Sequence, residues 1–249
     1  MSPVPTSLRK MKTAVSATGV LSKPGLYQCT AGRRDQPYTT QNPGGPAGSH
    51  AEKTVTVRGN KHSLPKPFFV LATQNPIELE GTYPLPEAQL DRFLFNVVLD
   101  YLDAEQEVAV IERFTRSIDL PPVDTCTNAE AIIGFQTLVR QVPISEALNR
   151  YAVDIVRATR PADPSAPDII KKYVNFGSSI RATMNLVLAA KARALMEGRY
   201  HVIAEDMQVL ALPILRHRVL ANYYAESDNI TLDEILQQML DSIPAPDNN

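Results

Sequence analysis

Three polar side chains, those of Asn75, Arg92 and Arg181, are of types that contact phosphate groups. Asn75 comes soon after the apolar run 68–72, and an open α/β sheet places its ligands at the carboxyl ends of its strands. A carboxamide at that point can orient an attacking water or touch a γ-phosphate. An asparagine before a proline is also a common turn former, and the local sequence alone favours the turn.

Arg92 lies where a segment stiffened by Pro84 and Pro86 leads into a second apolar run. A guanidinium is always charged and can bind phosphate through two N–H groups at once. An arginine held rigidly near a subunit surface therefore suits the neutralisation of charge during phosphoryl transfer. The alternative is a structural salt bridge with Asp91 or Glu87.

Arg181 follows a Gly-Ser-Ser sequence (177–179) at the start of an alanine-rich segment. Helix N-termini attract phosphate, and an arginine in the first turn adds a full positive charge. The alternative is a solvated surface arginine. The Arg-His-Arg run at 216–218 is interpreted as a helix end, and the four histidines of the chain have no metal-ligand spacing.

Composition limits the classes of protein to which the chain can belong. A length of 249 residues is enough for one large domain or two small ones, and a hydrophobic content of 44% is enough to form their cores. A net charge of −2 supplies no strong basic field, which argues against nucleic-acid or membrane-surface binding. Cys29 and Cys126 are isolated, so they predict neither a metal site nor a disulfide and fit a cytoplasmic location. No apolar run is long enough to predict a membrane span.

The first fifty residues differ in character from the rest. They are rich in proline and glycine, hold six Lys or Arg against one acidic residue, and show no hydrophobic period. Such a segment buries too little apolar surface to offset the entropy lost on ordering. Residues 1–50 are therefore expected to form a disordered arm.

The next segment, residues 51–126, predicts a small α/β unit. Short extended runs at 54–57 and 61–64 flank a glycine-containing turn and predict a β-hairpin. The continuous apolar run 68–72 predicts a buried strand, because both of its faces are hydrophobic, and the run 93–99, apolar except for Asn96, predicts a second one.

Helical periodicity dominates after residue 101, and residues 127–249 predict an α-helical domain. Capping residues and apolar spacing mark the individual helices. Expected starts are Asp103 (with Gln106), Thr127 (with Glu130), Ser145, Ser178, Ala204 and Thr231 (with Glu234). Gly198 is an expected end, and the helix from Ala204 is expected to bend or end at Pro213. The first of these helices is expected to bury Val108, Ile111 and Phe114.

Taken together, these features resemble a known family. Residues 51–244 resemble the C-terminal part of a MoxR-type AAA+ ATPase, and they make up roughly four fifths of the chain. A match of this length and order is very specific. The motifs that carry it are Phe68 to Pro76, Glu80 to Phe93, Arg157 to Pro161, Ala189 to Leu195, Glu205-Asp206 and Leu215 to Arg218.

The resemblance implies roles for the three phosphate-binding candidates. Asn75 would be sensor 1, Arg92 the arginine finger acting on the nucleotide of a neighbouring subunit, and Arg181 sensor 2 in the lid. The hairpin at 54–64 would be the insertion before the sensor 1 strand. Ile180 stands where many relatives have proline, a departure that should leave Arg181 undisturbed.

The resemblance also implies cofactors and partners. ATP and Mg²⁺ would be the cofactors, although the groups expected to bind them are largely absent from this sequence. The family forms homo- or hetero-oligomeric rings, expected here to be hexameric. It couples ATP hydrolysis to the remodelling or maturation of partner proteins, and proteins with von Willebrand A domains are expected among them.

Two motifs of the family do not occur in the sequence. The Walker A loop, GxxxxGK[ST], supplies backbone N–H groups and a lysine to the phosphates, and the Walker B strand ends in acids that hold Mg²⁺. In the family's sheet the strand that carries the P-loop lies between the runs matching 68–72 and 93–99, which here lose their shared neighbour. The expected fold is therefore α/β, a partial and distorted AAA+ P-loop NTPase core followed by a nearly normal helical lid.

Three interpretations of the sequence stay open. The first is an incomplete MoxR-type ATPase subunit, which alone neither binds ATP tightly nor hydrolyses it. The second is a non-catalytic ring component or interaction module that gives Arg92 to a neighbour's nucleotide. The third is a gene fragment without function, in which residues 1–50 are not a selected sequence.

Overall fold

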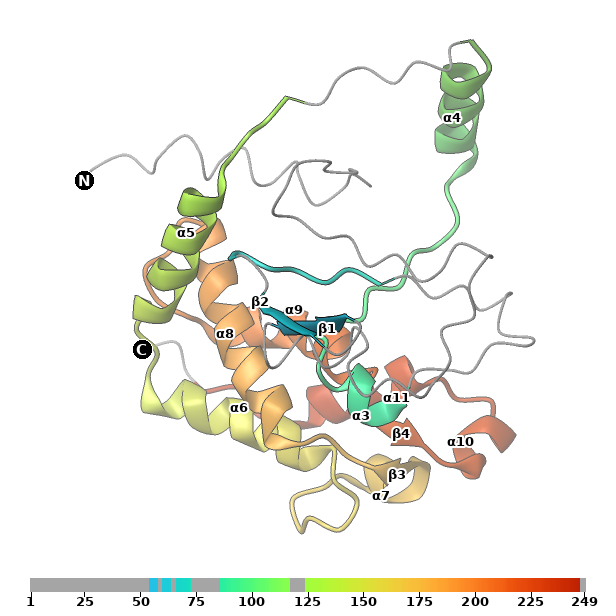
Figure 1. Ribbon diagram of the computed structural model, residues 1–249. Helices are drawn as coiled ribbons and strands as arrows, with labels where there is room; N and C mark the ends of the chain where they lie inside the picture. The colour runs from blue at the N-terminus through green and yellow to red at the C-terminus, as the bar shows by residue number, and fades with distance from the viewer. Residues whose placement is uncertain (1–53, 58–59, 64–65, 73–85, 117–123, 247–249) are drawn as a thin grey trace.

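The computed structural model describes most of the chain after residue 53 (Figure 1). The expected arm at 1–50 and the sensor 1 candidate Asn75 lie outside the described residues. The described ranges are 54–57, 60–63, 66–72, 86–116 and 124–246.

The second half of the chain forms a unit of seven helices and one small antiparallel sheet, which we call the helical unit. The sheet pairs β3 (Val174–Phe176) with β4 (Leu220–Ala221). The helices are α5 (Ala129–Gln141), α6 (Glu146–Ala158), α7 (Asp168–Tyr173), α8 (Ile180–Met196), α9 (Ala204–Leu215), α10 (Tyr223–Ser227) and α11 (Leu232–Ser242).

The helical unit is held together by one hydrophobic core. Helix α8 packs against α5, α6 and α9, while α11 packs against α7 and α9. Fully buried side chains come from each of the central helices, including Ile155, Leu186, Met207, Ile214 and Ile235. Burying each such side chain contributes about 1.5–3 kcal/mol. The expectation of a nearly normal helical lid agrees with this core.

Local signals fix most ends of these helices. The Thr231 hydroxyl accepts from the Glu234 amide at 3.3 Å, and the Glu234 carboxylate accepts from the Thr231 amide at 2.8 Å, so the predicted capping box is present. Gly198 has φ +77°, a left-handed conformation that ends α8 without a side-chain clash. Helix α5 is capped by Asn128 rather than by the expected Thr127, because the Asn128 side chain accepts from the Ala131 amide at 2.8 Å.

Of the two outcomes expected at Pro213, a bend or an end of the helix, the end is wrong, because α9 continues through Pro213 to Leu215. A proline inside a helix lacks the N–H that would bond to the preceding turn, although its own carbonyl remains an acceptor. The Pro213 carbonyl accepts a hydrogen bond from the Asn96 amide at 2.8 Å, so this turn of α9 contacts the first half of the chain.

The first half contains the predicted hairpin. Strand β1 (Thr54–Val57) pairs antiparallel with β2 (Asn60–Ser63), with Val57 opposite Asn60. Two helices follow, a single turn α3 (Glu87–Leu90) and the longer α4 (Ala104–Arg116).

The two further strands predicted at 68–72 and 93–99 are wrong, because neither segment has strand structure. In the described part of the first half, strand pairing occurs only within the hairpin. An apolar run without a neighbour to pair with gains nothing from the strand conformation, since its backbone N–H and C=O groups stay without ladder partners. Residues 93–96 instead give backbone groups to the helical unit.

Helix α4 forms as predicted, but its apolar side is not buried. Its start is capped, since the Gln106 amide donates to the Asp103 carboxylate at 2.8 Å. Val108, Ile111 and Phe114 are 52%, 61% and 55% exposed, so the expected burial is wrong. Figure 1 shows the reason, because α4 stands apart from the other described elements. In the described part of the chain no helix is long and apolar enough to cross a membrane.

Candidate functional site

The Asp91 carboxylate connects the two halves of the chain at the candidate site. Asp91 follows α3, and its two oxygens bind guanidinium groups from two parts of the helical unit. Arg181 Nη1 lies 2.6 Å from Asp91 Oδ2, and Arg218 Nε lies 3.0 Å from Asp91 Oδ1. The carboxylate thereby bridges the start of α8 and the turn after α9.

Arg218 is the buried member of this cluster, with a side chain only 1% exposed. Besides the Asp91 carboxylate, its guanidinium donates to the backbone carbonyls of Asp91 and Leu94, at 2.9 and 3.4 Å, and to those of Phe93 and Ile214. Burial lowers the pKa of Arg218, while the hydrogen bond and the charge of Asp91 oppose that shift. The buried cation is therefore matched by one anion and several carbonyl dipoles.

The two residues before Arg218 hold the same segment. Arg216 Nη1 donates to the Asn96 carbonyl at 3.0 Å, and its other nitrogens bind the Asp233 carboxylate at 2.6 and 3.1 Å. His217 Nε2 lies 3.2 Å from the Phe93 carbonyl. Because a carbonyl only accepts, Nε2 carries the proton, and the buried Nδ1 has no hydrogen-bond partner among the described atoms. We call residues 216–218 the docking cluster.

The docking cluster fixes the backbone around Arg92. The carbonyls on either side of this residue, those of Asp91 and Phe93, both accept from Arg218. Arg92 itself is exposed at the surface. The turn is thus held by hydrogen bonds to the helical unit, and by those of the Arg92 and Phe93 amides to carbonyls of α3, rather than by strand pairing. The Arg92 side chain therefore starts from a fixed piece of backbone.

The start of α8, which carries Arg181, is fixed by a close backbone approach. A Cβ placed on Gly177 would lie 2.4 Å from the Thr159 carbonyl oxygen, so only glycine fits. The next amide, that of Ser178, donates to the Thr159 hydroxyl at 2.9 Å. These contacts attach the first turn of α8 to the end of α6, and they set the place from which Arg181 reaches Asp91.

The structure therefore brings Arg181 to the segment of Arg92, with Asp91 between them, whereas Asn75 is outside the described residues. The sequence had offered Asp91 as a partner for Arg92 and had given 216–218 little functional weight. The sequence did not indicate that the Asp91 carboxylate forms ion pairs with Arg181 and Arg218. The available signal was the Arg-His-Arg run itself, because two arginines around a histidine in an otherwise apolar stretch require acceptors wherever they are buried.

The chemistry of this donor set suits a phosphate and not a metal ion. Arg92 and Arg181 offer N–H donors and positive charge near the surface. Across the described ranges, no group of three or more His, Cys, Asp and Glu could hold a metal. The residues present therefore fit the phosphate part of a nucleotide.

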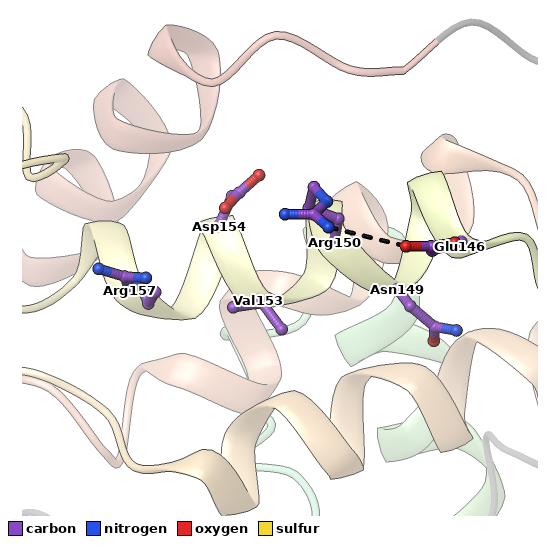
Figure 2. Close-up of a pocket in the computed structure, with 6 residues that line it drawn as sticks. All are labelled: Glu146, Asn149, Arg150, Val153, Asp154 and Arg157. Atoms are coloured by element: carbon purple, nitrogen blue, oxygen red, sulfur yellow. Dashed lines mark ion pairs between the residues drawn. The ribbon is translucent and has the colours of Figure 1, made fainter.

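A separate depression lies on the outer side of α6, with a volume of about 320 Å³ (Figure 2). All of its lining side chains come from this one helix, and they are Glu146, Asn149, Arg150, Val153, Asp154 and Arg157. Arg150 pairs with Glu146 at 3.7 Å, and both side chains are largely exposed. The depression is thus a solvated helix face with mixed charges.

Comparison with known families identifies the class of protein that this fold and site define. A family described as "ATPase family associated with various cellular activities (AAA)" matches residues 47–95, and the family "AAA lid domain" matches residues 167–239. Arg92 falls in the first match, and Arg181 and Arg218 fall in the second. The chain is an AAA+ ATPase homologue with a helical lid.

Individual relatives narrow the class. The chain is 35% identical over 198 residues to "Chaperone MoxR1" of Mycobacterium tuberculosis and 26% identical over 210 residues to "Protein MoxR" of Paracoccus denitrificans. These matches cover 80% and 79% of this chain, but 52% and 61% of the relatives. The chain belongs to the MoxR-type AAA+ ATPases.

A solved structure supports the assignment. The crystal structure of a putative ATPase from Cytophaga hutchinsonii matches with a TM-score of 0.74 and 38% sequence identity. The match covers 81% of this chain and 61% of that one. The chain therefore spans between half and two thirds of the length of the relatives named here.

Proposed function

We propose that the chain works in a MoxR-type assembly that hydrolyses ATP, in which Arg92 acts on the nucleotide held by a neighbouring subunit. One observation carries the proposal: Arg218 holds the backbone carbonyls on both sides of Arg92, while Arg92 lies exposed. A cation on a fixed backbone is what stabilises the charge that develops on a transferred phosphoryl group, because it needs no reorganisation during the reaction.

Arg181 is proposed as sensor 2, a second phosphate contact. It lies in the first turn of α8, and its side chain is 48% exposed although Nη1 is paired with Asp91. A guanidinium has five N–H donors, so a contact through one nitrogen is compatible with a second acceptor. Asn75 is proposed as sensor 1 on its sequence context alone, with ATP and Mg²⁺ as the cofactors of the assembly.

The chain by itself is proposed not to turn over ATP. Its sequence contains no GxxxxGK[ST] loop, and without one the β- and γ-phosphates lack their usual backbone cradle. The activity of the assembly would then depend on a subunit that has this loop. A hexameric ring in the cytoplasm, acting on partner proteins that include von Willebrand A domains, completes the proposal, and the name of the mycobacterial relative as a chaperone supports the remodelling role.

The test uses an intact MoxR-type subunit encoded in the same genome, whose own arginine at the position matching Arg92 is replaced by alanine. That subunit can bind ATP but lacks the trans-acting guanidinium, so its steady-state ATPase rate should be low. Adding this chain should raise the rate by about 10²-fold or more, since an arginine finger contributes on the order of 10³ to 10⁵ in turnover. Arg92→Ala in this chain should abolish the increase.

Arg140→Ala is the matched control, because it removes an exposed guanidinium from the last turn of α5, outside the candidate site. It should restore the rate as well as the unchanged chain does. If the unchanged chain fails to raise the rate, or if Arg92→Ala raises it equally, the proposed trans role of Arg92 is wrong. ATP hydrolysis by the chain alone that is lost on Arg92→Ala would contradict the proposed lack of activity in isolation.

A further inference from the structure

Asp91 lies at the point where both phosphate-binding candidates are attached. Its carboxylate binds Arg181 at 2.6 Å, and its peptide bond leads directly to Arg92. The positions of Arg92 and Arg181 therefore both depend on Asp91. The Asp91 carboxylate is negatively charged and would repel a phosphate. Such a residue serves the site through its neighbours, not by contacting the ligand.

Asp91 is held in place by contacts other than the one to Arg181. Arg218 donates to its Oδ1 at 3.0 Å and to its backbone carbonyl at 2.9 Å, and the Arg218 side chain is almost fully buried. Asp91 is therefore fixed through both its side chain and its backbone, and its Oδ2 becomes a fixed acceptor.

Arg181 is the most exposed side chain among the three groups that meet at Asp91. A free arginine side chain samples many rotamers, and the loss of this freedom opposes binding. Pairing Nη1 with a fixed carboxylate oxygen removes most of that freedom before any ligand arrives. The pair is charge-assisted and shorter than an ordinary N–H···O bond, so it can order a side chain that is 48% exposed.

We propose that Asp91 is a positioning residue that holds Arg181 by its side chain and Arg92 by its backbone, so that the two arginines meet phosphate as one preorganised unit anchored on Arg218. The inference rests on the proposed function for the phosphate, but the Asp91–Arg181 coupling stands by itself. Asp91 is the one acidic side chain in a set with three arginines, Arg92, Arg181 and Arg218. Neutralising Asp91 would therefore make the set more positive and strengthen its attraction to phosphate. The proposal nevertheless expects weaker productive binding, because Arg181 would no longer be held in place.

The first measurement is NMR of the arginine guanidinium groups in the full chain, with Arg181→Lys used to assign the Arg181 signals. A carboxylate-bound guanidinium rotates slowly about Cζ–Nε, so its Nη signals stay resolved. Asp91→Asn should merge the Arg181 signals, whereas Asp100→Asn, an equivalent change at an exposed site, should leave them resolved. Unchanged Arg181 signals in Asp91→Asn would overturn the coupling.

Asp91→Asn leaves the buried Arg218 without its anion and can destabilise the fold. The double substitution Asp91→Asn with Arg218→Met removes the buried cation together with its partner, so no unpaired charge remains. A folded double variant with merged Arg181 signals supports the coupling equally well, and its unchanged signals would refute it.

The second measurement is the ATPase rate restored in the mixed assembly described above. Asp91→Asn should lower the restored rate about tenfold, chiefly through kcat, because an ordering contact for a transition-state ligand is lost. In an Arg181→Ala background the same change should cost less than about twofold, since the two residues act as a unit. Losses that multiply independently would overturn the positioning role. If the unchanged chain restores no rate, the proposed function and the phosphate half of the inference fail together, while the NMR result still decides the coupling.

Discussion

Arg218 shows how a buried charge can replace a missing element of secondary structure. Its guanidinium reaches four backbone carbonyls, three of them in the segment 91–94, and this segment would otherwise need strand pairing to satisfy them. Removing a guanidinium from water is costly, and it is tolerated here because the Asp91 carboxylate lies 3.0 Å away. Side chains of the docking cluster thus form hydrogen bonds with the backbone carbonyls of residues 91–94, in place of the hydrogen bonds that a neighbouring strand would supply.

His217 makes the stability of the chain depend on pH. Burial, and after it the charge of Arg218, lowers the pKa of His217 to about 4, although the hydrogen bond to the Phe93 carbonyl opposes the shift. An unfolded histidine has a pKa of about 6.5, so between these values the unfolded state binds the extra proton. Stability therefore falls as the pH drops from about 6.5 towards 4.

The expected loss between pH 7.5 and pH 5.0 is on the order of 1–2 kcal/mol. Urea unfolding followed by circular dichroism at the two pH values measures it. His217→Gln keeps a donor for the Phe93 carbonyl but cannot take up a proton, so it should remove most of this loss. The exposed His201→Gln serves as the control and should keep the full loss. An equal pH dependence in His217→Gln and the unchanged chain would show that another group is responsible.

At the scale of elements, two glycines in the helical unit should respond to alanine in opposite directions. In Gly177→Ala the new Cβ would lie 2.4 Å from a backbone oxygen of Thr159, which cannot move without displacing α6. The expected cost is about 1–3 kcal/mol. In Gly134→Ala the Cβ, on helix α5, meets no atom within 4 Å, so alanine should stabilise by about 0.5–1 kcal/mol.

Thermal and urea unfolding of the two variants measure the difference. Because both substitutions add the same methyl group, a shared effect on the unfolded chain largely cancels in the comparison. Two changes of the same sign would mean that the approach of residue 177 to α6 is not maintained in solution. A Gly177→Ala variant should also weaken the Asp91–Arg181 pair, since the first turn of α8 would shift.

At this scale, the sequence predicted well the helices whose ends are marked by local capping residues. The capping box at Thr231 and the left-handed Gly198 depend only on nearby residues in the sequence, so the start of α11 and the end of α8 were predicted closely. The runs 68–72 and 93–99 were predicted from apolar content, but a strand depends on its neighbours, and neither run has one among the described residues. The short β3 and β4 escaped prediction because a strand pair depends on tertiary contacts, and the short helices α3, α7 and α10 were also not predicted.

In the candidate site, too, local features were predicted from the sequence and long-range contacts were not. Arg92 and Arg181 stood out because their residue type and the motifs around them are local features. Their connection through Asp91 joins residues that are 90 apart in the sequence, and no periodicity or cap indicates such a contact. The assignment of their roles stays a prediction, and the mixed-assembly experiment addresses it.

At the scale of the whole molecule, stability is concentrated in the helical unit. Among residues 66–72, 86–116 and 124–141, Pro67 alone is buried, while the cluster from Val142 to Leu240 forms the core. Residues 86–116 contribute no buried side chain, and they are attached to the helical unit through the docking cluster, the Asp91–Arg181 pair and the hydrogen bond from Asn96 to Pro213. Unfolding of the chain should therefore report on α6, α8, α9 and α11.

Two isoleucines test this division. Ile155→Ala in α6 empties a fully buried position and should cost about 2–5 kcal/mol, whereas Ile111→Ala in α4, at a side chain 61% exposed, should change stability by less than about 0.5 kcal/mol. Urea unfolding measures both changes, and amide hydrogen exchange should show strong protection in α8 and α9 and little in α4. If Ile111→Ala were as costly as Ile155→Ala, the apolar side of α4 would be packed in solution and the first half would hold a core that its exposure does not suggest. The expected result instead leaves α4 as an amphipathic helix whose stability comes from its own cap and backbone.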